Sequence, residues 1–475
     1  MVNLNQQSFG FQHVTRYGRM QAPALGFLRN PLAIFVAICI LGLFLGGISD
    51  ISWLFLPYRW WFVAGLALGM LGMLFRISRI PYRPEHRALF AFMAVSTVSC
   101  IASPMPEYSF ARLFSFIVMF IGVFLGVWVW LQKSENLEML VTIYLVTAIT
   151  GAVWSAADIF QTASFIPETR FTGAFEKATG TGSFAAASLP VVLWRTRYSK
   201  GRWKIFFLFI LFVLFYMLVF SGARAAIIGG LTATLVWLWK HWKNWRVFLA
   251  GLLITFSTLV LCGALTLDVL PSYIVREHSL STFTGRIPRW NLGLSLFAES
   301  PVIGHGYGMT RYIQMYEEDE QLKGIIVPDR VTFLDAIPGF GKKWLGRMTL
   351  HSDHVERLLE GGIFAYICFA CFWFFLIRRL FQVLFLTPDL RTSLAIALGL
   401  NVSYIFIDSF MHGALFAINA PGTLLAWVAI VLFMAASDRV LKNQMITCAS
   451  SMSSTVLIRV REVQATPCAV SCRLR

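Results

Sequence analysis

Charged side chains are scarce in this chain of 475 residues. Only 13% of the residues are Asp, Glu, Lys or Arg, whereas 57% are hydrophobic. A water-soluble protein of this length does not need so much apolar surface, because single hydrophobic cores stop growing beyond about 250–300 residues. The composition therefore argues against an ordinary soluble protein. Many apolar runs approach or exceed the roughly 18–20 residues that span a bilayer, which predicts a polytopic membrane protein.

Cysteine is also sparse, and its positions give no indication of disulfide bonds. The chain has eight cysteines, and most of them lie in apolar runs. Cys368 and Cys371 form a Cys-x-x-Cys pair, but it lies inside a predicted membrane helix with no strand before it. This context argues against a thioredoxin-like redox motif.

Signatures of metal and nucleotide sites are missing as well. His351, Asp353 and His354 are close in sequence, but their spacing is not HExxH and no other ligand cluster is evident. We predict no metal and no cofactor, with zinc at these three residues as the alternative. The run GHGYG from Gly304 follows no strand and opens no helix, so it is interpreted as a turn that allows close backbone approach.

Acidic residues are outnumbered by basic ones, 24 against 40, which gives a net charge of +16. Such an excess can indicate nucleic-acid binding. Here the basic residues cluster in short loops between apolar runs, as the positive-inside rule expects. We therefore predict contact with membrane lipids and no binding of nucleic acid.

The apolar runs predict an all-α fold with about twelve transmembrane helices. The predicted spans are 31–49, 60–75, 88–103, 110–131, 137–157, 182–195, 203–221, 223–240, 246–267, 356–377, 392–411 and 413–435. The basic loops alternate so that both termini are predicted to be cytoplasmic and the loops after odd-numbered spans face outward. Residues 1–30 then form a cytoplasmic leader, 31–267 carry nine spans, 356–435 carry three, and 436–475 form a disordered cytoplasmic tail.

Residues 268–355 form a long outer loop, and loops of that length are usually functional or disordered. Ile287, Trp290, Leu294 and Phe297 recur at spacings of three and four. This stripe predicts a short amphipathic helix in the loop, which could lie on the membrane surface.

Three arginines on the predicted outer side are candidates for binding an anion. Arg224 lies in SGARAA between two spans, on the side where basic residues are disfavoured. Arg286 and Arg289 are about one helical turn apart and can share a face. The arginine fork donates two parallel hydrogen bonds to a phosphate, so together they could bind a diphosphate. The alternatives are snorkelling to lipid headgroups or a salt bridge to a neighbouring span for Arg224, and ordinary interfacial anchoring for Arg286 and Arg289.

The stretch LHSDHVERLLEGG gathers titratable groups directly before an apolar run. Asp353 followed by Glu356 fits a capping box, so the span is predicted to begin there, and Glu360 is expected to pair locally with Arg357. His351 before the cap, or His354 in the first turn, is a candidate general base, because imidazole suits proton transfer near neutral pH. The alternative is a hydrogen-bonded loop histidine.

Weaker candidates lie in two other places. Arg170 and Lys177, in the outer loop RFTGAFEK, could add positive charge to the same site, although a flexible loop is an equal alternative. Asp408 and His412 form an intramembrane pair at the outer end of the span 392–411.

The ordered motifs FTGAF, SGAR, TGRIPRW, GHGYG and LHSDHVERLLEGGI resemble the O-antigen ligase superfamily, which includes Wzy-type O-antigen polymerases and exopolysaccharide polymerases. The resemblance covers roughly residues 165–375. The family's last motif typically reads His-Asn, then Glu-x-Gly. Aligning on Glu360 and Gly362 puts His351 on the family histidine, with Ser352 in place of the common Asn, and this departure keeps His354 as an alternative.

The resemblance implies a glycosyltransferase at the periplasmic face of the bacterial inner membrane. The donor would be a glycan on undecaprenyl pyrophosphate. The acceptor would be a sugar hydroxyl, either on lipid A–core or on another lipid-linked glycan. A metal-independent, inverting reaction is expected, with Arg224 and Arg286 matching the family arginines that bind the diphosphate and His351 as the base.

Several points stay open at this level. Ligation and polymerisation share donor and chemistry, so the sequence does not separate them, and an association with polysaccharide export machinery is an open expectation. The alternative function is a membrane transporter or flippase for lipid-linked glycan. Many transporters have repeated halves, and no such repeat is apparent in this sequence.

Overall fold

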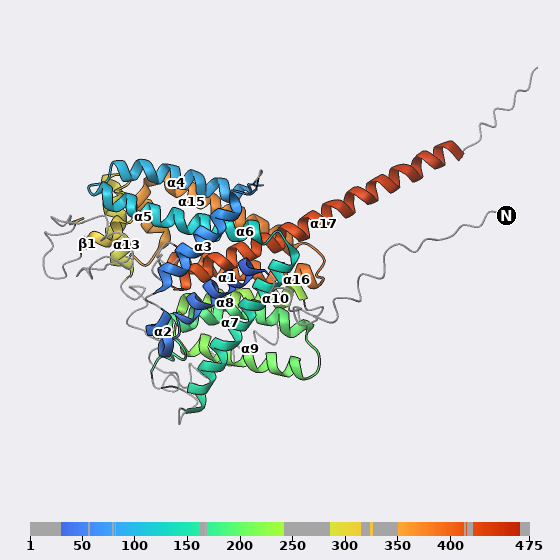
Figure 1. The fold of residues 1–475 in the computed structure, drawn as a ribbon, viewed down its shortest axis with the longest axis horizontal. Coiled ribbons are helices and arrows are strands. Elements are labelled where there is room, and N and C mark those ends of the chain that lie inside the picture. Colours follow the sequence, from blue (N-terminus) through green and yellow to red (C-terminus); the bar gives the residue numbers. More distant parts are fainter. Residues whose placement is uncertain are drawn as a thin grey trace, which may run out of the picture.

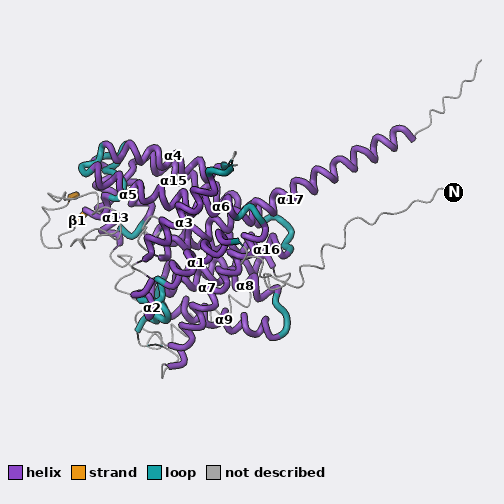
Figure 2. Tube along the Cα trace, viewed as in Figure 1, coloured by secondary structure: helices purple, strands orange, loops and turns teal. Residues whose placement is uncertain are grey.

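The computed structural model describes residues 30–55, 58–77, 80, 82–161, 167, 169–241, 286–314, 324–325, 350–412, 415 and 421–465. Helices make up nearly all of this part of the chain (Figure 2). Two strands of two residues, β1 (Ile313–Gln314) and β2 (Gly324–Ile325), pair antiparallel.

The helices follow the predicted spans. In chain order they are α1 (Pro31–Leu45), α2 (Ser49–Phe55), α3 (Arg59–Leu74), α4 (Pro84–Ile101), α5 (Pro106–Met119), the π-helical η4 (Phe120–Val127), α6 (Trp128–Trp130), α7 (Ser134–Gln161), α8 (Ala178–Tyr198), α9 (Arg202–Phe220), α10 (Arg224–His241), α13 (Arg286–Glu299), the 3-10 turn η6 (Met309–Tyr312), α15 (Asp353–Leu384), α16 (Leu390–Met411) and α17 (Pro421–Ala465). Each predicted span within the described ranges overlaps a helix. The ninth, 246–267, lies outside them.

Five helical segments of the described chain are long and apolar enough to cross a membrane. They are Pro106–Trp130, Ser134–Phe160, Arg202–Phe220, Asp353–Leu384 and Leu390–Met411, and shorter apolar helices accompany them. The chain is therefore an all-α membrane protein, as predicted. The total of twelve spans and the sidedness of the loops remain predictions.

Local sequence explains where several helices begin. The Asn30 side chain accepts hydrogen bonds from the backbone N–H groups of Leu32 and Ala33, and Pro31 occupies the first helical position of α1. The Asp389 carboxylate caps α16 by accepting from Thr392 N at 2.6 Å. Such caps satisfy donors that a helix start would otherwise leave without partners.

The core is aromatic at its centre. Trp427 of α17 packs against Phe116 of α5, Phe124 of η4 and Phe372 of α15, with ring centroids 5.4–6.2 Å apart. Tilted and edge-on pairs of this kind suit the ring quadrupoles. A single cluster thus joins helices from the first and last thirds of the chain.

The long helices pack side by side into one bundle with two distinct ends. α15 lies along α4, and α16 packs on α8, α10 and α17. Figure 1 shows α13 at one end of the bundle and the C-terminal part of α17 extending beyond the other. The candidate site, described below, lies at the α13 end.

The predicted disordered tail from residue 436 is helical as far as Ala465, so the prediction was wrong for these residues. α17 runs from Pro421 to Ala465 as one helix of 45 residues. The sequence between Gly422 and Pro467 has neither glycine nor proline to interrupt a helix. The helix ends just before Pro467, which fits the restriction that proline places on the preceding residue.

The helix predicted in the long loop is present as α13, but its buried face differs from the predicted stripe. That stripe comprised Ile287, Trp290, Leu294 and Phe297. In the structure Leu292 and Leu296 are buried against Leu350 and Leu359, whereas Leu294 is 44% exposed. Apolar residues occur on both flanks of α13, so its packing against α15 decides which of the two flanks is buried.

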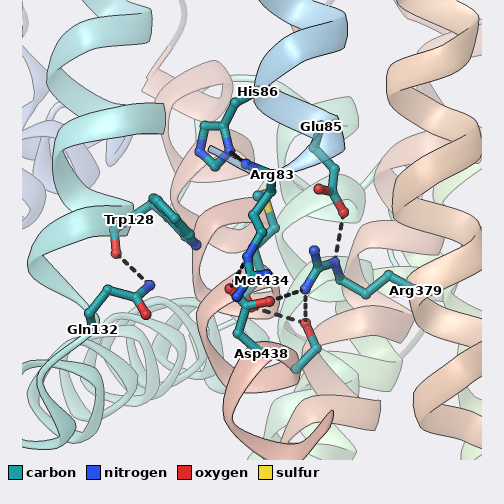
Figure 3. A network of polar contacts seen from close by, with 9 residues as sticks. Arg83, Glu85, His86, Trp128, Gln132, Arg379, Met434 and Asp438 are labelled. Carbon is teal, nitrogen blue, oxygen red and sulfur yellow. Dashed lines mark hydrogen bonds and ion pairs between the residues drawn. The ribbon is translucent and has the colours of Figure 1, made fainter. Parts of the chain in front are cut away.

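A buried ion-pair network ties α15 to α4 and α17 (Figure 3). The Arg379 Nε lies 2.7 Å from Glu85 Oε1, and its Nη1 lies 2.5 Å from Asp438 Oδ1. Arg83 Nε adds a contact of 3.2 Å to Asp438 Oδ2. Two cations face two carboxylates, so the network balances its own charge.

Candidate active site

The site begins at the N-terminus of α15. Ser352 is the N-cap, and its Oγ accepts a hydrogen bond from Val355 N at 3.4 Å. The predicted cap at Asp353 was therefore one residue late. Asp353 is fully buried, and its Oδ2 accepts from Leu415 N at 3.0 Å. Both residue types cap helices well, so only the tertiary contact to residue 415 separates them.

His351 directly precedes this cap and has an unusual backbone. Its φ of 53° lies in the left-handed region, which costs of order 1–3 kcal/mol for a residue with a Cβ. The side chain is half-buried. Burial, together with the charges of Arg289 and Arg286, lowers the pKa of His351 to about 4. At neutral pH this imidazole is uncharged and has a lone pair that can accept a proton.

The structure brings the three candidate arginines together. Arg224 is the first residue of α10 and Arg286 is the first residue of α13. Burial lowers the pKa of Arg286, the nearby charges of Arg289 and Arg224 lower it further, and the Asp408 carboxylate opposes them. Residues 62 positions apart in sequence thus share one electrostatic environment, which also contains His351.

The weak candidate Asp408 is part of this environment through His412. His412 Nδ1 lies 2.6 Å from Asp408 Oδ1, one helical turn earlier on α16. The Nε2 of the same ring lies 3.2 Å from Arg286 Nη2. The predicted Asp408–His412 pair is therefore confirmed, and it contacts an arginine of the site.

His354, the alternative base, is held in the protein interior. Its Nε2 lies 3.1 Å from Ser409 Oγ and its Nδ1 lies 3.3 Å from Tyr366 OH. The ring stacks on Phe410 with centroids 3.8 Å apart and an interplanar angle of 11°. Both ring nitrogens of His354 therefore have partners inside the protein, whereas Arg289 and Arg286 act on His351. Among the described residues, no group of three or more His, Cys, Asp or Glu side chains could hold a metal ion.

The auxiliary candidates Arg170 and Lys177 lie in different settings. Arg170 Nε donates to the carbonyl oxygen of Ser221 at 2.7 Å, in the turn that carries Arg224. Phe171 N donates to Phe220 O at 2.9 Å. The FTGAF loop therefore buttresses the SGAR turn. Lys177 is exposed at the start of α8.

The GHGYG loop docks into a break in α15. At Gly362 the backbone of α15 leaves the helical region, with φ 68°. There His305 N donates to Leu359 O at 3.0 Å and Gly306 N donates to Glu360 O at 2.9 Å. A Cβ on Gly304 would lie only 2.5 Å from Glu360 O. The predicted close backbone approach is confirmed, and it joins two sequence motifs.

A buried polar cluster lies beneath this loop. Arg357 Nη1 pairs with Glu360 Oε2 at 2.7 Å, as predicted, and Thr310 Oγ1 donates to Glu360 Oε1 at 2.6 Å. The Arg357 guanidinium carbon lies 4.9 Å from the centroid of the Tyr307 ring. Sequence reasoning missed Arg112, which is buried against Gly308. Its one signal was an arginine inside an apolar run.

Comparison with known proteins agrees with these motifs. Residues 209–370 match the family model described as O-antigen ligase. The matched region contains Arg224, Arg286, Arg289 and His351, together with the GHGYG loop. No curated protein matches the chain. The family match confirms the resemblance predicted from the sequence.

Proposed function

We propose, from the match of residues 209–370 to the O-antigen ligase family model, that this protein is an inner-membrane glycosyltransferase with a periplasmic active site. It would transfer a glycan from undecaprenyl pyrophosphate to a sugar hydroxyl of an acceptor. The observation that carries the proposal is that Arg286 and Arg289 act on an uncharged His351 and that Arg224 acts on Arg286. A group of cations beside a neutral base suits a reaction with an anionic leaving group and a hydroxyl nucleophile.

The arginines would stabilise the leaving group. When the bond between the anomeric carbon and the diphosphate oxygen breaks, the electron pair stays on the lipid diphosphate. Preorganised donors aimed at developing negative charge are usually the largest single contribution to catalysis. Arg224 and Arg286 stand at the first residues of α10 and α13, where a helix dipole also favours anions.

His351 would act as the general base. The acceptor oxygen attacks the anomeric carbon, its proton moves to the imidazole, and inversion at that carbon is expected. A pKa of about 4 makes His351 a weak base. A bound diphosphate would offset the charges of Arg286 and Arg289 and raise this pKa toward its ordinary value. The base would then become stronger once the donor is in place.

The acceptor decides between two forms of the function. Transfer to lipid A–core would be ligation, and transfer to another lipid-linked glycan would be polymerisation of an O-antigen or exopolysaccharide. The site residues described above act on the donor and on the hydroxyl proton, which both reactions share. The proposal therefore covers both, with no step assigned to a metal or cofactor.

The test is complementation of a deletion strain. Wild type should restore the surface polysaccharide, whereas Arg224→Ala, Arg286→Ala and His351→Ala should each fail although the variants insert into the membrane. Bare lipid A–core with accumulated lipid-linked polymer in the deletion would identify a ligase. Persistent single repeat units or lost secreted polymer would identify a polymerase. Unchanged glycan in the deletion would contradict the proposal and favour a transporter.

A further inference from the structure

The Asp408–His412 pair lies against Arg286 but has no part in the transfer chemistry proposed above. We propose that His412, held by Asp408, is a positioning residue that orients the Arg286 guanidinium for a lipid diphosphate. The inference rests on the proposed function, because it assigns a supporting group to the same donor site. Its basis is a chain of two short contacts across residues 126 positions apart in sequence.

The direction of each hydrogen bond follows from the groups involved. A guanidinium only donates, so His412 Nε2 must accept from Arg286 Nη2 across their 3.2 Å separation. The ring proton is then on Nδ1, which donates to Asp408 Oδ1 at 2.6 Å. The carboxylate therefore selects the tautomer that Arg286 requires, as outer-shell carboxylates do for metal-bound histidines.

The backbone fixes the position of this pair. His412 follows the last residue of α16, and its N–H donates to Asp408 O at 2.7 Å. Ser409, next to Asp408, bonds His354 on α15. The C-terminal end of α16 therefore packs on the N-terminal end of α15, and α15 begins two residues after His351.

Arg286 needs such a support for an electrostatic reason. Arg289 and Arg224 repel it, and a flexible arginine side chain would otherwise turn away from them. Asp408 supplies an opposing charge through the neutral ring of His412. The contact uses one N–H of a fork that has five, which leaves paired donors for a phosphate.

A pair of substitutions at residue 412 separates positioning from other roles. In His412→Gln the amide oxygen can reach the place of Nε2 and still accept from Arg286. In His412→Asn the shorter side-chain amide can replace Nδ1 in the hydrogen bond to Asp408, but it cannot reach Arg286. A proton-transfer role would be lost in both variants, whereas a role limited to ending α16 would survive both.

The experiment measures binding of farnesyl diphosphate to the full-length protein in nanodiscs. A lost hydrogen bond to a charged group corresponds to about a 10- to 100-fold loss in affinity. We expect that loss for His412→Ala and His412→Asn, with His412→Gln within about threefold of wild type. Adding Arg286→Ala to His412→Ala should be no worse than Arg286→Ala alone, because the two residues act as one unit.

His241→Ala is the matched control. His241 Nε2 contacts Ser393 Oγ at 2.9 Å and so joins α10 to α16, two helices of the site, near the other end of each. Its diphosphate affinity should equal that of wild type. A general weakening of helix packing would appear in this variant as well, and would overturn the specific role of His412.

The outcomes distinguish this inference from the proposed function. If Arg286→Ala weakens binding but His412→Ala does not, the positioning role is overturned and the donor site stands. If His412→Gln loses as much diphosphate affinity as His412→Ala, the imidazole ring itself is required, and the positioning role is overturned too. If wild type does not bind the probe, or Arg286→Ala leaves binding unchanged, the donor site and the inference both fail.

Discussion

Gly306 donates its backbone N–H to the carbonyl oxygen of Glu360, 2.9 Å away, where α15 is interrupted. In an uninterrupted helix that carbonyl would accept from Phe364, four residues later. The GHGYG loop supplies the donor instead, and Ile363 N turns to Pro301 O at 2.9 Å. The break in α15 and the loop therefore require each other, which explains why both segments are rich in glycine.

This relationship predicts that Gly304→Ala destabilises the protein. The residue has φ 76°, and an added Cβ would lie 2.5 Å from Glu360 O, which is backbone and cannot swing away. We expect a loss of about 1–3 kcal/mol, visible as a lower unfolding temperature in detergent. Gly72→Ala, in a helix with open space around the new Cβ, should be neutral or slightly stabilising. Equal behaviour of the two variants would contradict the docking.

A second prediction concerns the network of Arg379, Glu85 and Asp438. Removing one partner of a buried ion pair leaves uncompensated charge, so Arg379→Ala should lower the free energy of unfolding by about 3–5 kcal/mol. Arg378, its exposed neighbour on α15, provides the control, since surface substitutions usually stay within about 0.5 kcal/mol. Chemical unfolding of the purified variants measures the difference, and similar values would show that the network contributes little.

Substitutions of His351 and His354 should have different effects in a transfer assay. His351→Ala should lower kcat by about 100- to 10,000-fold, the usual contribution of a general base. His354→Ala should instead lower stability, because it removes contacts to Ser409, Tyr366 and Phe410, while its transfer rate per folded molecule stays within about tenfold of wild type. The reverse pattern would transfer the role of base to His354.

The fall in transfer rate at acid pH should report the pKa of His351. Its uncharged form is the active one, so activity falls as pH drops through its pKa. For kcat/KM, which reports the free enzyme, the rate should stay level from neutral pH to about 5 and halve near 4. Arg289→Ala removes a charge that lowers this pKa, so the fall in its rate should move to higher pH. If wild-type kcat/KM instead halves near pH 6.5, the ordinary pKa of histidine, His351 is not buried beside the arginines as the structure shows.

The sequence by itself determined the class of the protein and the place of its helices. Long apolar runs leave a helix as the form that satisfies the backbone in lipid. The ordered motifs also named Arg224, Arg286 and His351. These are properties of local composition and order, which a chain displays before it folds.

The tertiary structure alone decided which groups meet. The sequence kept His354 as an alternative to His351, but packing places one beside the arginines and encloses the other between Ser409 and Tyr366. The cap at Ser352, the buried face of α13 and the contact of His412 with Arg286 likewise depend on partners far along the chain. Burial and side-chain direction arise only when helices pack, so no local pattern could specify them.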